Sequence, residues 1–287
     1  MANTREIKLR IRGVEGTKKI TKAMKLIAAS KLKKAREMHE RTLPFFKHIQ
    51  EVMVDIMQNS PEMPLIYFDK RENKEKRKVA YIVISSDSGL NGGYNTNIIK
   101  KAMSEINKDG SVVFPIGNVI KNQMIKNGYN VNTEIGVNNY SVTTITAGEI
   151  AKYMLKLFKE GQIDELKLIY TEMEGAMSLI PHTINLLPLQ IRDFKVKENG
   201  MSDVLDFDPS PEIVFERLTN QYLKGVLYGG MVESFVSEHF ARMTAMDNAT
   251  TNAEKVSKKL TLDYNRARQQ SITQEITEII GGAMNTN

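Results

Sequence analysis

The stretch GTKKITKAMKLIAASKLKKAREM, residues 16–38, is rich in lysine and has no acidic residue before Glu37. It lies inside a longer pattern in which apolar or small residues recur every three or four positions, from Ile7 to Ile56. That spacing predicts one amphipathic helix. At about 1.5 Å of rise per residue, a helix of roughly 50 residues would extend on the order of 75 Å. A helix of this length needs a partner along its apolar stripe.

A second apolar stripe of the same periodicity runs from Val214 to Ile279, after the helix-breaking run DFDPSPE. Gly229-Gly230 predicts a local break in this second helix, and Gly281-Gly282 predicts its end. Two very long helices at opposite ends of one chain suggest each other as partners. If they pair, the chain direction requires an antiparallel coiled coil.

The first helix contains Pro44, which removes one backbone hydrogen bond. Because the apolar stripe continues in phase beyond it, Pro44 predicts a bend in the helix rather than its end. The end is predicted near Asn59-Ser60-Pro61.

Between the two helices the sequence changes to short apolar runs separated by helical stretches. The predicted strands are residues 78–86, 111–116, 129–135, 166–173 and 184–191, and the predicted helices are residues 97–106, 119–126 and 147–160. Such alternation predicts a mostly parallel, layered α/β domain. The predicted organisation is an N-terminal coiled-coil helix (1–59), a linker (60–77), the α/β domain (78–195), a second linker (196–211) and a C-terminal coiled-coil helix (212–287).

The composition excludes several classes of protein. The 287 residues include no cysteine, which excludes disulfides and thiolate metal sites within this chain. The histidines, His39, His48, His182 and His239, are too far apart for a metal-ligand spacing. No apolar run approaches the roughly 20 residues of a transmembrane helix, so we expect a soluble chain without direct membrane insertion. No secretory signal or transit peptide is evident at the N-terminus.

The basic stretch is open to four interpretations: an import signal, a helix lying on a membrane, a nucleic-acid arm, or a surface that moves against a protein partner. Its early acids, Glu6 and Glu15, argue against a transit peptide. The formal net charge of +6 is mild for a protein of this length that follows a phosphate backbone. Nucleic-acid binding is therefore permitted and not required.

The loop ISSDSGLNGGYN, residues 84–95, follows a predicted strand and precedes a predicted helix. Phosphate-binding loops occupy such positions, but this loop matches neither the G-x-G-x-x-G nor the G-K-[ST] fingerprint. The favoured interpretation is a tight crossover in which Asn95 caps the next helix. Asp87, Glu172 and Glu174 have no catalytic companions at a useful spacing, so no enzyme site is predicted and no cofactor is expected.

The C-terminal segment LTLDYNRARQQSITQEITEIIGG has a polar face opposite its apolar stripe. Arginine, glutamine and threonine predominate on that face. It fits a wet surface, and it also fits a surface that makes side-chain hydrogen bonds to a partner.

Three stretches of the chain resemble signatures of the gamma subunits of F-type ATP synthases. They are IKLRIRGVEGTKKITKAMKLIAASKLKKA, SSDSGLNGGYN and AMDNATTNAEKVSKKLTLDYNRARQQSITQEITEIIGG, in the order that the family has. The resemblance implies a central rotor stalk: an antiparallel coiled coil inside a ring of alpha and beta subunits, beside a Rossmann-like α/β domain that binds no nucleotide. It also implies that catalysis belongs to the beta subunits, while this chain couples it to ion flow.

The resemblance further implies contact residues. Arg268 and Gln269 look like the pair that hydrogen-bonds the beta-subunit catch loop, with Thr273 and Glu275 in support. The remaining implied contacts are Met24 and Lys25 with the ring, Asp87 and Asn91 near the base of the ring, and Leu205, Asp206, Phe207 and Asp208 near the epsilon subunit and the membrane c-ring.

The chain also departs from the family pattern. Gly13 and Gly16 stand where the family usually has Ser and Asn, and Asn91 stands at a place often held by a small residue or cysteine. The resemblance implies a peripheral position on the cytoplasmic face of a bacterial plasma membrane, without nucleic acid as a partner. The alternatives are a basic coiled-coil protein that binds nucleic acid and a Rossmann enzyme of unrecognised type.

Overall fold

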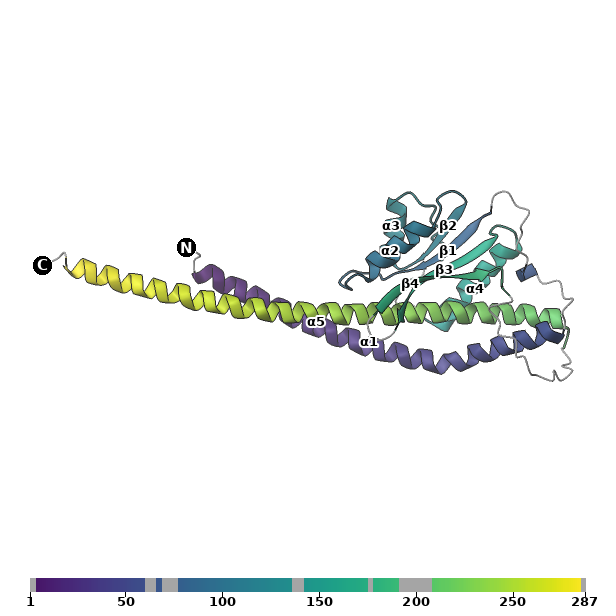
Figure 1. Ribbon diagram of the computed structural model, residues 1–287, viewed down its shortest axis with the longest axis horizontal. Coiled ribbons are helices and arrows are strands. Elements are labelled where there is room, and N and C mark those ends of the chain that lie inside the picture. Colours follow the sequence, from purple (N-terminus) through teal and green to yellow (C-terminus); the bar gives the residue numbers. More distant parts are fainter. Residues whose placement is uncertain are drawn as a thin grey trace. The chain divides into compact units, whose positions relative to one another are not determined.

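The computed structural model describes residues 4–59, 66–68, 77–135, 142–174, 178–190 and 208–284 (Figure 1). In the described residues, two long helices, α1 and α5, lie at the ends of the chain, with four strands, three shorter α-helices and one 3-10 helix between them. The elements are α1 (Thr4–Asn59), a short 3-10 helix η1 (Ile66–Phe68), β1 (Val79–Ile84), α2 (Tyr94–Glu105), β2 (Ser111–Ile116), α3 (Asn118–Lys126), α4 (Thr144–Lys159), β3 (Glu165–Glu174), β4 (Ser178–Leu187) and α5 (Pro211–Met284).

The chain forms two compact units. The first combines Met1–Ser30 with Arg242–Asn287, and the second is Lys31–Ala241. Each unit therefore contains part of α1 and part of α5. The boundaries between the predicted coiled-coil and α/β segments do not coincide with these units, and those boundaries stay a prediction.

The second unit contains one sheet with the strand order β2-β1-β3-β4. β1 pairs in parallel with β2 and with β3, while β3 and β4 are antiparallel. The predicted mostly parallel α/β arrangement is confirmed. The antiparallel pair needs only a short connection, whereas each parallel pair is joined through helices.

Alternate residues of the strands build two cores on opposite faces of the sheet. Tyr81, Val83 and Val113 face one core, to which α2 and α3 contribute the buried Ile98 and Met124. The other face carries the larger core, filled by α4 and by the parts of α1 and α5 that belong to this unit. Its buried members include Ile82, Phe114, Leu168, Met53, Ile56, Phe158, Phe215 and Tyr228. The α/β sheet is thus covered on one face by the long helices themselves.

The two terminal helices run antiparallel. In the second unit the ring of Phe46 on α1 lies 6.2 Å from the ring of Tyr228 on α5. In the first unit Glu15, Thr21 and Lys25 contact Ser257, Thr250 and Asp247 respectively. The residue numbers on α5 fall as those on α1 rise, so the predicted antiparallel pairing is confirmed.

Helix α1 continues through Pro44 and ends at Asn59, as the sequence predicts. Helix α5 differs from the prediction. It has no break at Gly229-Gly230 and extends past Gly281-Gly282 to Met284. A glycine costs a helix only about 1 kcal/mol relative to alanine. Gly230 also has a packing role, because a Cβ there would lie 2.7 Å from Leu168 Cδ2.

Two predicted strands differ from the structure. Residues 129–135 form no strand, and only Val131 makes an isolated parallel bridge, with Val113. β4 begins at Ser178 rather than at residue 184. It includes Pro181, which interrupts an apolar pattern, yet an edge strand tolerates proline because one side of its backbone has no neighbouring strand to pair with.

The β3–β4 pair carries a small cluster of ionisable side chains. Tyr170 lies opposite His182, with ring centroids 6.3 Å apart, and its hydroxyl donates to Glu172 Oε2 at 3.2 Å. His182 Nε2 lies 3.0 Å from Glu174 Oε1. Burial, reinforced by the negative charge of Glu172, raises the pKa of Tyr170 to about 12.

This pKa predicts a stability change at alkaline pH. The phenol of an unfolded chain ionises near pH 10. The raised folded pKa of Tyr170 therefore adds stability that is fully present below about pH 10 and is lost as the pH rises toward about 12. We expect the free energy of unfolding to fall less steeply across this window in Tyr170→Phe than in the unsubstituted chain. Denaturant titrations at several pH values measure the difference, and parallel slopes would contradict the assignment.

Candidate functional site

The loop after β1 is closed by its own side chains. Asn95 Oδ1 accepts hydrogen bonds from the backbone N–H of Ser86 at 3.2 Å and from Ser86 Oγ at 2.8 Å. Asn91 Nδ2 donates to Ser86 Oγ at 2.9 Å, and Asn95 Nδ2 donates to Asn91 Oδ1 at 3.1 Å. Ser86, Asn91 and Asn95 are all buried. The polar groups that could have met a phosphate are bonded to one another.

The prediction that Asn95 caps α2 is therefore wrong. The N-cap position is held by Gly93, without a side-chain cap, and Asn95 lies one residue inside the helix. Its amide reaches back to the end of β1 because the residues between them fold into a tight loop. Within that loop Leu90 and Gly92 both have positive φ.

The same loop is tied to the start of α3. Asp87 Oδ1 accepts from the backbone N–H of Asn118 at 3.0 Å, and Ser85 Oγ accepts from that of Ile120 at 3.0 Å. Between β2 and α3, Gly117 has a φ of 99°. A Cβ on Gly117 would lie 2.3 Å from the carbonyl oxygen of Ser85. Backbone and side chains thus fill the carboxyl edge of β1 and β2, where open α/β sheets bind ligands.

These contacts bear on the predicted partner residues Asp87 and Asn91. The Asn91 side chain is 2% exposed and faces inward, while one oxygen of Asp87 bonds α3. Leu90, at the tip of the same loop, is 64% exposed. A contact of this loop with another chain would therefore pass through its tip. That contact stays a prediction.

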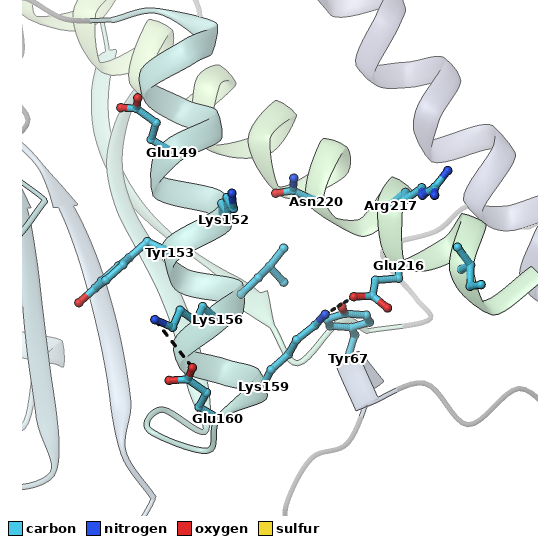
Figure 2. A pocket seen from close by; sticks show the side chains of 12 residues that line it. Tyr67, Glu149, Lys152, Tyr153, Lys156, Lys159, Glu160, Glu216, Arg217 and Asn220 are labelled. Carbon is cyan, nitrogen blue, oxygen red and sulfur yellow. Dashed lines mark hydrogen bonds and ion pairs between the residues drawn. The ribbon is translucent and has the colours of Figure 1, made fainter.

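A groove in the second unit was not predicted from the sequence. It has a volume of about 960 Å³ and lies between α4 and the first turns of α5, with Tyr67 of η1 beside it (Figure 2). Both basic and acidic side chains line it. The residues that line it include Lys152, Tyr153, Lys156, Lys159, Glu160, Glu216, Arg217 and Asn220.

Ion pairs join several side chains of this groove. Lys159 Nζ contacts Glu216 and lies 5.7 Å from the centroid of the Tyr67 ring. Burial opposes the charge of Lys159, but hydrogen bonds to Glu216 and Tyr67 prevail and raise the pKa of Lys159. Lys156 pairs more loosely with Glu160, at 3.9 Å. In the described part of the chain no three His, Asp or Glu side chains gather as a metal site would require.

Sequence reasoning missed this groove for a simple reason. Tyr67, Lys159 and Glu216 come from three elements far apart in the chain, and no short motif joins them. The lysine spacing on α4 was the only available signal, and on its own it is typical of any solvated helix face.

The predicted catch-loop residues lie on the last third of α5. Arg268, Gln269, Thr273 and Glu275 are exposed. The side chains of Thr273 and Glu275 bond within the helix, to Gln269 O at 2.9 Å and to Ser271 Oγ at 3.4 Å. Arg268 and Gln269 are neighbours on the chain, so both can face one partner. Their contact with a beta subunit stays a prediction.

Met24 and Lys25 lie on α1 in the first unit, and both are half-buried. Lys25 Nζ bonds Asp247 Oδ1 of α5 at 2.6 Å, so its charge is used within the chain. Lys18 similarly pairs with Glu15 at 3.3 Å. Lys19 and Lys22 are exposed and remain available to other molecules.

Of the predicted foot contacts, Leu205, Asp206 and Phe207 lie outside the described residues. Asp208 is described and exposed. None of the described helices has the length and hydropathy of a bilayer span.

Comparison with known proteins covers nearly the whole chain. The ATP synthase family profile matches residues 3–285. The chain is 45% identical to the ATP synthase gamma chain of Ruminiclostridium cellulolyticum, over 98% of each chain. It is 45% identical to the ATP synthase gamma chain of Acetivibrio thermocellus, over 99% of each chain.

Solved structures show the same fold. A chain of the Euglena gracilis mitochondrial ATP synthase (OSCP/F1/c-ring, rotational state 3) matches 99% of this chain over 94% of its own length, with a TM-score of 0.70 and 20% identity. A chain from the central stalk and c-ring of the Tetrahymena thermophila mitochondrial ATP synthase matches 80% of this chain over 99% of its own, with a TM-score of 0.55 and 24% identity. The paired terminal helices, the closed β1 loop and the full-length match together place the chain in the ATP synthase gamma chain family.

Proposed function

We propose that this chain is the rotor shaft of an F-type ATP synthase, coupling ion-driven rotation of a membrane c-ring to the conformations of catalytic beta subunits. The observation that carries the proposal is the end-to-end match to gamma chains, at 45% identity over 98% of the chain. The match includes both long helices, which are the parts of the molecule that a shaft requires. The two-helix pairing supports it, since two helices packed together resist bending better than one.

The exposed surface of α5 supports an enclosing partner. Along its last third, Ile272, Ile276, Ile279 and Ile280 are between 46% and 72% exposed. Four isoleucines on one short segment are unusual for a free helix surface and are typical of a helix that another chain covers. We assign that role to the ring of alpha and beta subunits.

We further propose that the chain contributes no catalytic group. The polar groups of the β1 loop satisfy one another, and two lysines of the groove pair with carboxylates. Neither arrangement offers a nucleophile beside a base. We assign ATP synthesis and hydrolysis to the beta subunits, and to this chain the transmission of conformational change.

The basic stretch then belongs to the rotor surface. Its exposed lysines, with Lys19 and Lys22 in the first unit, would face acidic groups of the enclosing ring. Solvent-screened ion pairs contribute only about 0 to 1 kcal/mol each. Contacts this weak would not hold the shaft at any single rotational angle. A rotating shaft needs this property, because it must separate from each beta subunit in turn.

The foot of the shaft, including Asp208, is proposed to contact the epsilon subunit and the c-ring. The chain would then work peripherally, at the cytoplasmic face of a bacterial plasma membrane. This placement rests on the family and on the predicted partners.

The double substitution Arg268→Ala and Gln269→Ala tests the proposal. Loss of hydrogen bonds to a charged partner costs about 1.5 to 3 kcal/mol, so we expect ATP-driven ion pumping of the reconstituted complex to fall roughly tenfold or more. Because both side chains are exposed, unfolding of the isolated chain should not change.

Lys258→Ala with Lys259→Ala is the matched control, since both lysines are exposed on the same helix. We expect near-normal pumping from it. Normal pumping in the Arg268 and Gln269 variant would remove these two residues from the coupling surface. Failure of the unsubstituted chain to assemble with alpha and beta subunits would reject the rotor function itself.

A further inference from the structure

The seam between α1 and α5 in the first unit includes small side chains. Ala28 is 1% exposed, and Thr21 and Ala253 are each 8% exposed, while the larger Ile7 and Met246 are 7% and 5% exposed. Around Gly13 and Gly16, an added Cβ would meet nothing within 4 Å. Small side chains make shallow knobs and holes, so they resist a slide of one helix along the other less than large side chains do. At these positions apolar packing specifies the axial register weakly.

Three polar contacts cross the same seam, and we call them the polar rungs. Ser257 Oγ donates to Glu15 Oε1 at 2.9 Å. The hydroxyls of Thr21 and Thr250 lie 2.8 Å apart. Lys25 Nζ donates to Asp247 Oδ1 at 2.6 Å. The rungs follow one another along both helices in a single antiparallel register.

The threonine rung is directional. Each hydroxyl has one proton, and Thr250 Oγ1 also lies 2.7 Å from its own helix carbonyl, Met246 O. Thr21 Oγ1 is farther, 3.1 Å, from Lys18 O. The shorter intrahelical bond takes the Thr250 proton, which leaves Thr21 to donate across the seam. Since Thr21 is buried, its hydroxyl has little access to water as a substitute partner.

The glutamate rung is held from two sides. The hydrogen bond from Ser257, followed by that from Lys18, lowers the pKa of Glu15. Lys18 lies one turn along α1, 3.3 Å from the carboxylate, and keeps it aimed along the seam. The carboxylate thus stays ionised and oriented toward α5.

A slip of four residues in either direction would replace all three partners. In one direction Glu15, Thr21 and Lys25 would face Ala253, Met246 and Met243, which offer neither a hydroxyl nor a carboxylate. In the other direction they would face Thr261, Glu254 and Thr251, which are polar, but Lys25 would lose its carboxylate. No neighbouring register restores the same set of partners.

We propose that the polar rungs fix the axial register of α1 against α5, so that Glu15, Thr21, Lys25 and their partners act as positioning residues of the shaft. A slip of one turn would move Arg268 and Gln269 by about 5.4 Å along the axis relative to the surface of α1. A hydrogen bond does not survive a displacement of that size. The effect on coupling rests on the proposed rotor function, whereas the fixed register does not.

The chain contains no cysteine, so two introduced cysteines can carry spin labels without background. Two pairs of exposed positions suit the test: Lys8 with Asn248, and Lys22 with Leu262. The labels of the two pairs are offset in opposite directions from their register partners. A slip of one turn should therefore lengthen one distance and shorten the other, each by roughly 4 Å given the 5.4 Å pitch.

The test variant combines Thr21→Val, Thr250→Val and Lys25→Ala in the full-length chain, and the measurement is the electron–electron distance distribution. We expect a second population in which the two distances have moved in opposite directions. The matched control combines Thr17→Val, Thr261→Val and Lys19→Ala. Its threonines donate only within their own helices, to Gly13 O at 3.1 Å and Ser257 O at 2.9 Å. We expect the control to keep the original distances.

Two results would overturn the proposal. One is an unchanged pair of distances in the test variant. The other is a lengthening of both distances together, because that indicates that the rungs hold the helices side by side and do not set their register. Circular dichroism confirms that the variants remain helical.

A charge exchange gives an independent check that keeps the composition. Lys25→Asp alone places two carboxylates at one rung and should shift the register, whereas Lys25→Asp with Asp247→Lys should restore it. Failure of the exchange to restore the distances also overturns the proposal.

Ion pumping per ATP, measured in the assembled complex, separates this inference from the proposed function. We expect pumping to fall in the test variant while hydrolysis continues. Shifted distances with normal pumping would keep the fixed register and reject its role in coupling.

Discussion

Gly117→Ala is expected to lower the free energy of unfolding by about 3 kcal/mol or more. Two costs add at this position. The φ of 99° is unfavourable for a residue with a Cβ. The Cβ would also lie 2.3 Å from a backbone oxygen, that of Ser85, which cannot rotate away. Relief requires β1 and the start of α3 to separate, which strains the 2.8 Å bond from Ser85 N–H to Ile116 O. Urea unfolding of the full-length chain measures the loss.

Gly128→Ala is the control for the cost of placing a Cβ on a residue with positive φ. Gly128 also has a positive φ, of 74°, but nothing lies within 4 Å of an added Cβ. We expect a loss of about 1 kcal/mol there. Equal losses at the two glycines would show that backbone conformation alone, and not the close approach of the Ser85 carbonyl, makes Gly117 necessary.

Asn95→Ala is the second substitution with a large expected effect. It removes the acceptor of two hydrogen bonds from Ser86 and the donor to Asn91. These groups are buried, and each buried polar group left without a partner costs about 1 to 3 kcal/mol. We expect the free energy of unfolding to fall by about 2 to 4 kcal/mol in total. Chemical denaturation of the full-length chain is again the measurement.

Asn97→Ala makes the same chemical change two residues along α2, at an exposed position. We expect an effect within about 0.5 kcal/mol, because alanine favours a helix and no buried group loses a partner. A small effect at Asn95 as well would contradict the structural role of the loop and reopen the question of a ligand there.

The long helices could be predicted from the sequence because their signal is strong and local. Apolar residues recur with helical spacing over many turns, and no other structure satisfies such a pattern. Strands β1 and β2 could be predicted equally well, since each is a nearly continuous apolar run, as expected of a strand buried on both faces. Their parallel arrangement followed from the helices between them.

The errors have a common physical origin in contacts between distant residues. Gly229-Gly230 looks like a helix break, yet the space that Leu168 occupies beside Gly230 explains the glycine there. Residues 129–135 include four polar residues, and the segment makes only an isolated bridge to β2, at Val131. Edge strand β4 carries Pro181 within it, which local pattern reading treats as an interruption.

The candidate sites also fall into two groups: those that residue type and spacing identify, and those that depend on contacts between distant residues. The polar face of α5 and the lysines of α1 could be identified from residue type and spacing, although nothing in one chain shows what they touch. The groove beside α4 and the polar rungs could not be identified, because each joins residues separated by more than a hundred positions, such as Lys25 and Asp247. The inward-facing side chain of Asn95 could not be predicted either, because its hydrogen-bond partner Ser86 lies at the end of the preceding strand and not on the helix that contains Asn95.

The unequal lengths of the two terminal helices have a mechanical consequence. By the register of the rungs, the first residues of α1 lie opposite the region of Arg268, and from residue 268 to residue 280 every α5 side chain is exposed. A solitary helix of this length is marginally stable in water, whereas the paired segment gains stability from packing. The tip is therefore the more flexible end of the proposed shaft. Resistance to twisting is concentrated where the two helices are paired.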